Sequence, residues 1–330
     1  MNARAVQFDA PKSVSIVTTS VDDPGPEEVT IEATVSAISP GSELLVYRGN
    51  VPANLQADPT LESLDGTLSY PLQYGYATVG TVSRTGPDVD SGLLGEEVFA
   101  FHPHQTAFTL PETDIVTLPD GIDSVRGVLF PTVETATNFL LDGEPKIGET
   151  VVVFGAGVVG LTTIHLLSEY PLEQLVAIEP IDRRRELARS LGADAAYSPD
   201  DSIELGATGA DLVYELSGNP AALDDALELV GYDGRIVVGS WYGTKRHAPD
   251  FGGTFHRDRI SIVASQVSTI APALRGRWSR ERRRRVACEQ LSTLPIDALV
   301  TDRLPFTSAA EAYELLDTDP KTVQILLTYP

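Results

Sequence analysis

Cysteine, lysine and long hydrophobic runs are scarce or absent in this chain of 330 residues. The single cysteine, Cys288, excludes an internal disulfide and any zinc site built on two or more thiolates of this chain. A metal site would therefore need histidine and carboxylate ligands. No run of about 18 consecutive apolar residues is present, so the sequence predicts no membrane-spanning helix. The first residues lack the apolar core of a signal peptide, and we expect a cytoplasmic protein.

Positive charge is also scarce, because 24 lysines and arginines face 47 aspartates and glutamates, for a net charge of −23. Such an acidic surface repels nucleic acids and anionic membranes, so neither is expected as a partner. The acidic residues are spread along the whole chain, which favours the solvated acidic shell of a halophilic protein over an acidic surface for one binding partner. We therefore expect folding to depend on molar salt, which screens the self-repulsion.

The pattern of apolar residues changes near the middle of the chain. Before about residue 120, segments such as "SVSIVTT" and "YATVGTVSRTG" are rich in β-branched residues and are separated by turn residues. This pattern predicts strands that form an irregular β-barrel or sandwich. A helical stretch follows at about 124–142. From residue 149, short apolar runs such as "VVVF" and "DLVYEL" alternate with amphipathic helices, which predicts a parallel sheet covered on both faces. The predicted fold class is α/β, with a β-rich domain and a doubly wound parallel sheet.

A glycine-rich turn, "VVVFGAGVVGLTT", joins the first of these apolar runs to a helix. Gly155 permits the tight turn, Gly157 lets the backbone approach a pyrophosphate, and Gly160 lets helix and strand pack closely. The helix that opens at Val158 and Val159 directs its free N–H groups and its positive dipole end at the phosphates. This spacing, between a buried strand and a helix, predicts a dinucleotide site.

Glu179 ends the next predicted strand, "LVAIE", where a carboxylate would accept hydrogen bonds from the adenosine ribose hydroxyls. The same carboxylate would repel a 2′-phosphate, so NAD(H) is favoured over NADP(H). The alternative remains open, because Arg183, Arg184 or Arg185 could reach a 2′-phosphate. Further cofactor contacts are expected where predicted strands end, at Ser217, Gly239, Ser240, Ser265 and Gln266.

These segments, with "AISPGSELLVYRGN", "YGYATVGTV", "SLGADAAYSP" and "DGRIVVGSWYG", resemble the medium-chain dehydrogenase/reductase superfamily over nearly the whole chain. "FAFHPHQ", "SQVST" and "GRWSRERRRR" resemble its branch of zinc-binding and bacteriochlorophyllide dehydrogenase-like proteins. The resemblance implies a GroES-like catalytic domain at 1–132 and 270–330, and a Rossmann domain at 133–269. It also implies a homodimer or homotetramer, in which edge strands extend the sheet.

The sequence departs from the zinc-bearing members of this superfamily at each aligned catalytic ligand position. Pro40 stands where those members have cysteine, Tyr76 stands where they have histidine, and Pro131 falls at the third ligand. Ala77 replaces the acidic neighbour of that histidine. A catalytic zinc needs about three protein ligands, so we expect an enzyme that works without zinc.

Two histidines in "FAFHPHQTAF", His102 and His104, are open to several interpretations. Alternating spacing would place both on one strand face, where they could bind a metal with Glu43 or Glu134. A loop that lines the substrate cleft, with the histidines as donors or as a proton relay, is favoured over the metal site. Structural hydrogen bonding stands beside the relay as an equal alternative.

Without zinc, a substrate oxygen would need a hydrogen-bond donor in the transition state. The resemblance implies that Ser42 supplies the hydroxyl near that oxygen, and Tyr76 would point into the same cavity. Thr135 falls where the superfamily places a threonine against the nicotinamide, and Glu134 lies beside it. The segment "RGRWSRERRRR" either recognises an anionic substrate or effector or pairs with the acidic surface.

The leading hypothesis is a zinc-independent, NAD(P)(H)-dependent oxidoreductase that interconverts a secondary alcohol and a ketone or aldehyde, with a small-molecule substrate. A quinone or enone reductase of the same superfamily is the first alternative. The second alternative is a redox sensor that binds NAD(P)(H) without turnover.

Overall fold

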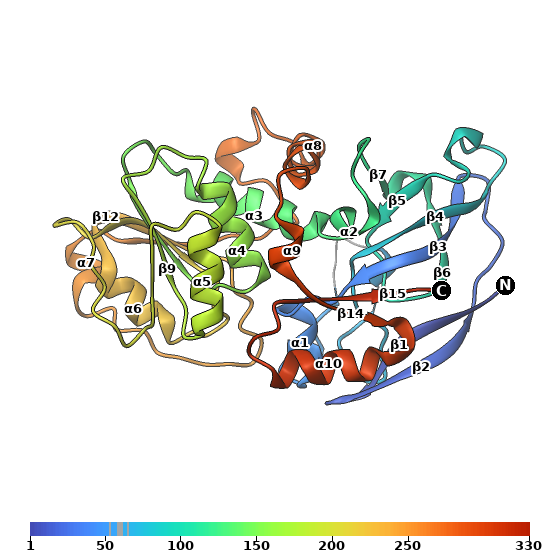
Figure 1. Ribbon diagram of the computed structural model, residues 1–330, viewed down its shortest axis with the longest axis horizontal. Helices are drawn as coiled ribbons and strands as arrows, with labels where there is room; N and C mark the ends of the chain where they lie inside the picture. Colours follow the sequence, from blue (N-terminus) through green and yellow to red (C-terminus); the bar gives the residue numbers. More distant parts are fainter. Residues whose placement is uncertain (53, 58–61, 65) are drawn as a thin grey trace. The chain divides into compact units, whose positions relative to one another are not determined.

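The computed structural model describes residues 1–52, 54–57, 62–64 and 66–330 and divides the chain into two compact units (Figure 1). The first comprises Met1–Pro131 and Leu291–Pro330, and the second comprises Thr132–Gln290. The sequence places the last boundary between residues 269 and 270, whereas the structure places it after Gln290. The reason is a contact within the second unit: Arg283 on helix α8 (Arg280–Leu291) binds Glu134 on helix α3 (Phe130–Gly143).

The first unit is built on antiparallel β-structure, as its alternating sequence predicts. In the described part of the chain, β1 (Asn2–Ala10) and β2 (Ser13–Ser20) form a hairpin sheet. The larger sheet has the order β14-β15-β3-β4-β5-β7, and β6 also pairs with β3. Its strands are β3 (Glu28–Ala37), β4 (Thr78–Thr85), β5 (Glu97–Ala100), β6 (Ala107–Pro111), β7 (Ile115–Thr117), β14 (Val300–Pro305) and β15 (Gln324–Thr328).

Buried apolar side chains of these strands form a core, and short helices accompany the strands. Val29, Ile31, Val98 and Phe108 are among the buried side chains of that core. Alternate residues of β3 and its neighbours supply them, because successive side chains of a strand point to opposite faces. The helices are α1 (Ser42–Tyr47), α2 (Ser124–Gly127), α9 (Ile296–Leu299) and α10 (Ala309–Thr318).

The second unit contains a parallel sheet with the order β10-β9-β8-β11-β12-β13 within the described residues. Every residue of β8 is buried, so both faces of the sheet are covered at this strand. The strands are β8 (Thr150–Phe154), β9 (Gln174–Ile178), β10 (Ala195–Tyr197), β11 (Ala210–Glu215), β12 (Val230–Val238) and β13 (Ser261–Ala264).

Helices connect these parallel strands, as parallel pairing requires. Helix α4 contacts β8 and β9, α5 contacts β9 and β10, and α6 contacts β11 and β12 (Figure 1). They are α4 (Val158–Leu167), α5 (Asp182–Ser190), α6 (Ala222–Leu229) and α7 (Thr254–Arg257), in addition to α3 and α8. The predicted α/β class, a β-rich domain with a doubly wound parallel sheet, is confirmed.

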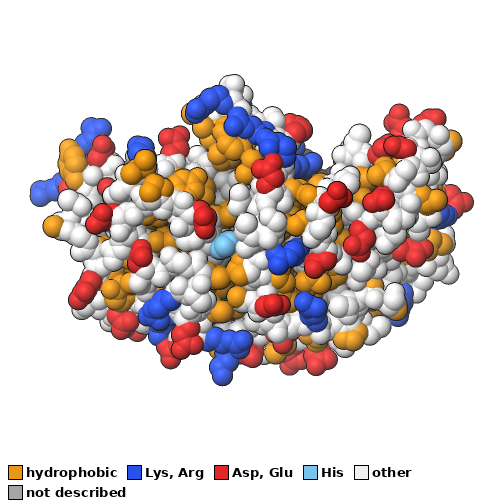
Figure 2. All heavy atoms as spheres, turned by 45° about the horizontal axis from the view of Figure 1, so that its top comes forward, with side chains coloured by type: hydrophobic (Ala, Val, Ile, Leu, Met, Phe, Trp, Pro, Cys, Tyr) orange, Lys and Arg blue, Asp and Glu red, His pale blue; other side chains and the backbone are white. Residues whose placement is uncertain are grey.

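Charge is distributed unevenly over the surface. Figure 2 shows acidic side chains scattered over the visible face, whereas lysine and arginine side chains gather over α8. Arg280, Arg282 and Arg285 of α8 are exposed. In the part of the chain that the structure describes, no helix is both long and apolar enough to cross a bilayer.

Candidate cofactor site and active site

The turn between β8 and α4 needs glycine at two positions. Gly155 has φ +90°, and a Cβ atom there would lie 2.6 Å from Cα of Ser217. A Cβ atom on Gly160 would lie 1.9 Å from the carbonyl oxygen of Gly155. The first glycine thus permits the turn and the second permits the contact between helix and strand, as the sequence predicts.

Gly157 differs, because the protein itself does not require a glycine there. Its φ is −72°, and a Cβ atom would meet nothing within 4 Å. It is the N-cap of α4 and provides no side-chain cap for the first N–H groups. Val158 is buried and Val159 is half-buried in the first turn. Open space before uncapped N–H groups suits a pyrophosphate, so these residues fit a dinucleotide.

Glu179 lies directly after β9 and is bound to the glycine-rich turn. Its Oε2 accepts a hydrogen bond from the N–H of Ala156 at 2.7 Å, and its Oε1 accepts one from Ile181 at 3.1 Å. A carboxylate offers about four acceptor positions, so capacity for ribose hydroxyls remains. Arg185 donates to the carbonyl of Glu179 and pairs with Asp182.

The other arginines after Glu179 are arranged differently from Arg185. Arg183 is exposed and Arg184 is half-buried on α5. The sequence left Arg183, Arg184 and Arg185 open as partners for a 2′-phosphate. Of the three, Arg185 is held by its hydrogen bond to the carbonyl oxygen of Glu179.

The structure brings Ser217 and Ser240 together around a residue that the sequence reasoning missed, Glu215. This carboxylate ends β11, is completely buried and accepts hydrogen bonds from both the N–H and the hydroxyl of Ser217. Ser240 Oγ accepts from the N–H of Gly218 at 2.9 Å. Tyr242 donates its hydroxyl to Glu215 Oε2 at 2.5 Å. An acid at the end of the apolar strand "DLVYEL" was the available signal.

Tyr242 stays protonated because burial, together with the neighbouring Glu215, raises its pKa. It therefore acts as a donor at this edge of the sheet. Gly239, which precedes Ser240, has a packing reason to be glycine: a Cβ atom there would lie 2.3 Å from Cζ of Phe139. Its predicted role near the cofactor stays a prediction.

Beyond β13, Ser265 and Gln266 make contacts within the chain. Ser265 donates to Oδ2 of Asp142 at 2.6 Å and accepts from Nδ2 of Asn138 at 3.0 Å. Burial raises the pKa of the Asp142 carboxyl, and hydrogen bonds from Ser265 and Asn138 oppose that rise. Gln266 Oε1 accepts from the N–H of Ser268 at 2.6 Å. Both residues thus belong to an ordered edge at the end of the last parallel strand.

Glu134, which the sequence suggested as a catalytic residue, pairs with an arginine. Its Oε1 accepts hydrogen bonds from Nε and Nη2 of Arg283 at 3.1 and 3.0 Å, and both side chains are almost completely buried. The carboxylate is thus held in a buried ion pair, and its predicted catalytic role stays a prediction. Thr135, the next residue on α3, is half-buried.

In the first unit, Tyr76 donates its hydroxyl to Ser39 Oγ at 2.7 Å. The N–H of Ser42 also donates to Ser39 Oγ, at 3.3 Å. The structure therefore places the two predicted donors, Ser42 and Tyr76, at one serine that sequence reasoning missed. Ser39, Ser42 and Tyr76 are all partly exposed.

A buried, hydrogen-bonded pair, His104 and Glu43, lies next to this cluster of hydroxyl-bearing side chains. His104 Nε2 lies 2.9 Å from Oε2 of Glu43, its Nδ1 lies 2.7 Å from Oγ of Ser36, and both His104 and Glu43 have no exposed surface. Tyr313 also donates to Oε2 of Glu43. Glu43 Oε1 accepts from the N–H of Ser39 at 2.8 Å, so the pair fixes the residue that contacts Tyr76.

The structure bears on each interpretation of the histidines. His102 and His104 lie in the loop between β5 and β6, as the loop interpretation expects, and not on one strand face. His104 does not reach solvent, because both ring nitrogens contact buried side chains. His102 stacks on Phe108 with the ring centroids 3.8 Å apart, and burial lowers its pKa to about 4.

The remaining question is whether side chains of the described residues could together bind a metal ion. Across residues 1–52, 54–57, 62–64 and 66–330, no three or more His, Cys, Asp or Glu side chains group in a way that could hold a metal ion. Pro40 and Pro131 offer no side-chain ligand.

Comparisons with known proteins agree with this architecture. Residues 158–280 match the family described as zinc-binding dehydrogenase. The chain is 27% identical over 269 residues to the D-guloside 3-dehydrogenase of Escherichia coli K12, covering 76% of this chain and 75% of the relative. It is 24% identical over 350 residues to the 2-desacetyl-2-hydroxyethyl bacteriochlorophyllide A dehydrogenase of Rhodobacter capsulatus, covering 100% and 99%.

Among solved structures, an alcohol dehydrogenase, rspB, of Escherichia coli CFT073 in complex with NADH has a similar fold. The TM-score is 0.80 at 21% identity, with 99% of each chain covered. Together with the glycine-rich turn and the two units, these matches support the resemblance seen in the sequence. The chain is an oxidoreductase whose sequence and fold are similar to those of the medium-chain dehydrogenase/reductase superfamily.

Proposed function

We propose that the protein is a zinc-independent oxidoreductase that uses NAD(H) to interconvert a secondary alcohol and a ketone or aldehyde. The observation that carries this proposal is the cluster of Ser39, Ser42 and Tyr76, in which Ser39 Oγ accepts hydrogen bonds from the Tyr76 hydroxyl and from the Ser42 N–H. Of these residues, Tyr76 stands where the resemblance places a zinc-binding histidine. The candidate dinucleotide site of the second unit supports the same proposal.

The dinucleotide site supports a nicotinamide cofactor, which would supply the hydride acceptor or donor when bound. Gly155 and Gly160 shape the turn, and Gly157 leaves the α4 N-terminus open to the pyrophosphate. Glu179 supports NAD(H) over NADP(H), because its buried carboxylate would repel a 2′-phosphate. The nearest arginine, Arg185, is already bound to the carbonyl of Glu179 and to Asp182.

Zinc does not fit the residues at the aligned positions, because Pro40 and Pro131 carry no ligand atom. Proton handling then belongs to hydroxyl groups of the chain. We propose that Tyr76 donates a hydrogen bond to the substrate oxygen and that Ser42 supplies the second donor. Ser39 would accept from Tyr76 when substrate is absent, as it does in the structure at 2.7 Å.

The names of the relatives support a secondary alcohol as the substrate. One relative is a D-guloside 3-dehydrogenase, and another, from Pseudoalteromonas atlantica, is a 2-dehydro-3-deoxy-L-galactonate 5-dehydrogenase. Both names specify oxidation at a secondary position of a polyhydroxylated compound. They do not favour a quinone or enone reductase, or a sensor without turnover.

The remaining expectations are part of the same proposal. The protein would act in the cytoplasm on a small molecule, without nucleic acid or membrane partners. A homodimer or homotetramer would form through β13, which ends the parallel sheet and exposes Val263. The net charge of −23 supports adaptation to high salt.

The test uses the full chain purified in molar KCl. NADH and NADPH binding are measured by fluorescence, and turnover is measured with simple secondary alcohols, polyols, glycosides and the corresponding ketones. Zinc is quantified in the same sample, and the assay is repeated after chelation. We expect NADH-linked turnover that survives chelation. Stoichiometric zinc whose removal abolishes turnover would contradict the zinc-independent mechanism.

A further inference from the structure

Several arginines of the segment "RGRWSRERRRR" make hydrogen bonds within the second unit. Four consecutive carbonyl groups, those of residues 267–270, each accept a hydrogen bond from one of its arginine side chains. Arg283 donates to the carbonyls of residues 267 and 269, Arg280 to that of residue 268, and Arg275 to that of residue 270. The sequence had left the segment open as an anion site or as a partner of the acidic surface.

Arg283 is the centre of this arrangement and is only 2% exposed. It makes five hydrogen bonds: two to Glu134, one to Oδ1 of Asn138 at 2.7 Å, and two to the carbonyls of Val267 and Thr269. A guanidinium has five N–H donors, so every donor of Arg283 has a partner. Lysine, with three donors and no planar fork, cannot reproduce this set.

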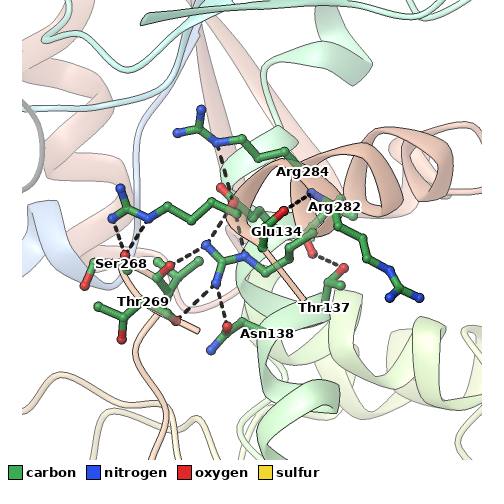
Figure 3. A network of polar contacts seen from close by, with 12 residues as sticks. Glu134, Thr137, Asn138, Ser268, Thr269, Arg282 and Arg284 are labelled. Carbon is green, nitrogen blue, oxygen red and sulfur yellow. Dashed lines mark hydrogen bonds and ion pairs between the residues drawn. The ribbon is translucent and has the colours of Figure 1, made fainter. Parts of the chain in front are cut away.

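The same network reaches the end of β13 from α3. Asn138 accepts from Arg283 and donates to both Asp142 and Ser265, and Ser265 also donates to Asp142. Figure 3 shows Glu134 and Asn138 on one helix, close to the segment that carries Ser268 and Thr269. Residues 265–270 are thus held by α3 at their beginning and by the arginines along their length.

The position of this segment in the sheet gives the network a role. The strand order β10-β9-β8-β11-β12-β13 reverses between β8 and β11, and a dinucleotide crosses the sheet at that point. The glycine-rich turn and Glu179 belong to β8 and β9, which assigns the adenosine half to that side. The nicotinamide half then lies over the carboxyl ends of β11, β12 and β13, where residues 265–270 begin.

We infer that Arg283, with Arg280 and Arg275, positions residues 265–270 as a backbone support for the nicotinamide half of the cofactor. The inference rests on the proposed cofactor use. Fixing a carbonyl group fixes its whole peptide plane, and so fixes the direction of the next N–H. Arg283 is therefore a positioning residue that acts through the backbone.

Two ligands separate this role from general stability. ADP-ribose contains the adenosine, pyrophosphate and ribose groups but lacks nicotinamide, whereas NADH contains all of them. In Arg283→Lys, shown to be folded by circular dichroism in molar KCl, we expect the Kd for NADH to rise by about tenfold or more. The Kd for ADP-ribose is expected to stay within about twofold.

A second variant keeps the test decisive if Arg283→Lys does not fold. Arg280→Gln removes the contact to the carbonyl of Ser268 from an exposed side chain, so folding is preserved. It should raise the NADH Kd in the same direction but less. Arg285→Gln is the matched control, because Arg285 is exposed and pairs with Glu289 on the same helix, α8. It should change neither Kd.

The outcomes distinguish the inference from the function on which it rests. Folded variants that bind NADH like the wild type, or that lose NADH and ADP-ribose equally, would overturn the positioning role. A wild-type chain that binds ADP-ribose but not NADH would instead contradict the proposed function. Selective loss of NADH affinity in the variants would support both.

Discussion

Tyr76 donates its phenolic hydrogen to the hydroxyl oxygen of Ser39 at 2.7 Å, and Ser39 is itself held through its N–H by the buried carboxylate of Glu43. The tyrosine thus occupies a defined position. Its hydroxyl has a fixed neighbour with which a substrate oxygen would compete.

Replacement of this hydroxyl tests the proposed chemistry. In Tyr76→Phe we expect kcat to fall by about 100–1,000-fold, since removal of a single positioned hydrogen-bond donor typically costs about that much. The Kd for NADH should not change. Steady-state kinetics and fluorescence titration measure the two quantities, and Tyr232→Phe, at a 70% exposed tyrosine, is the control. An unchanged kcat would remove Tyr76 from the mechanism.

The glycines of the turn form a matched pair. Gly157→Ala should leave folding nearly intact, because the added Cβ meets no atom within 4 Å, but should weaken NADH binding by about tenfold or more. Gly160→Ala should destabilise the fold by several kcal/mol, about the upper range for single substitutions, because its Cβ would lie 1.9 Å from the Gly155 carbonyl. Thermal melting and NADH titration separate the effects. Equal NADH affinity of Gly157→Ala and wild type would argue against a pyrophosphate at α4.

Cofactor choice depends on the charge of Glu179. In Glu179→Gln, one side-chain oxygen remains to accept from Ala156 while the negative charge is lost. We expect the preference for NADH over NADPH to fall by about tenfold, because repulsion of the 2′-phosphate is relieved. Both Kd values are measured at constant molar KCl. A ratio equal to that of the wild type would show that the carboxylate does not select the cofactor.

The buried pair of Glu43 and His104 predicts a large effect on stability. Glu43→Ala leaves His104, Tyr313 and the N–H of Ser39 without their common acceptor. Loss of one member of a buried pair costs about 3–5 kcal/mol, so the free energy of unfolding should fall by about that amount. Denaturant unfolding in molar salt measures it. Glu289→Ala, at an exposed helix position, should cost less than about 0.5 kcal/mol.

His102 predicts a dependence of stability on pH. Burial lowers its pKa from 6.5 to about 4, with a smaller opposing contribution from the carbonyl of Pro103. Between these values the unfolded chain binds a proton that the folded chain does not. This group therefore stabilises the fold fully above about pH 6.5, and its contribution falls as the pH drops toward about 4.

The comparison with His102→Phe isolates this contribution from the titration of the many carboxylates. The wild type should lose stability relative to the variant by up to about 1.4 kcal/mol per pH unit in that range. Denaturant unfolding at several pH values provides the measurement. Parallel pH profiles for the two proteins would show that His102 does not carry the effect.

Local sequence predicted the parts of the structure that depend on neighbouring residues. The glycine spacing in "VVVFGAGVVGLTT" predicted a strand, a tight turn and a helix. These elements depend on the backbone conformation of Gly155 and on the close contact of Gly160 with its neighbours in the chain. Glu179 was placed for the same reason, at the end of the next apolar strand. The α/β class followed from the change of apolar periodicity along the chain.

Contacts between distant segments could not be predicted in this way. Ser39 and Tyr76 are 37 positions apart, and Glu134 and Arg283 are 149 positions apart. No local pattern distinguishes an arginine that binds a buried carboxylate from one that faces solvent on the same helix. The sequence left His102 and His104 open between a metal site, a proton relay and structural hydrogen bonding, because local spacing does not reveal that the two rings have different partners.

The ion pair between Glu134 and Arg283 also joins the two ends of the second unit. Glu134 precedes all six strands of the parallel sheet in the chain, and Arg283 follows all of them. A shortened chain that stopped before Arg280 would keep the glycine-rich turn but leave Glu134 buried without its cation. Completion of the sheet and closure of this pair are therefore coupled, so the unit is expected to unfold as a whole and not strand by strand from its end.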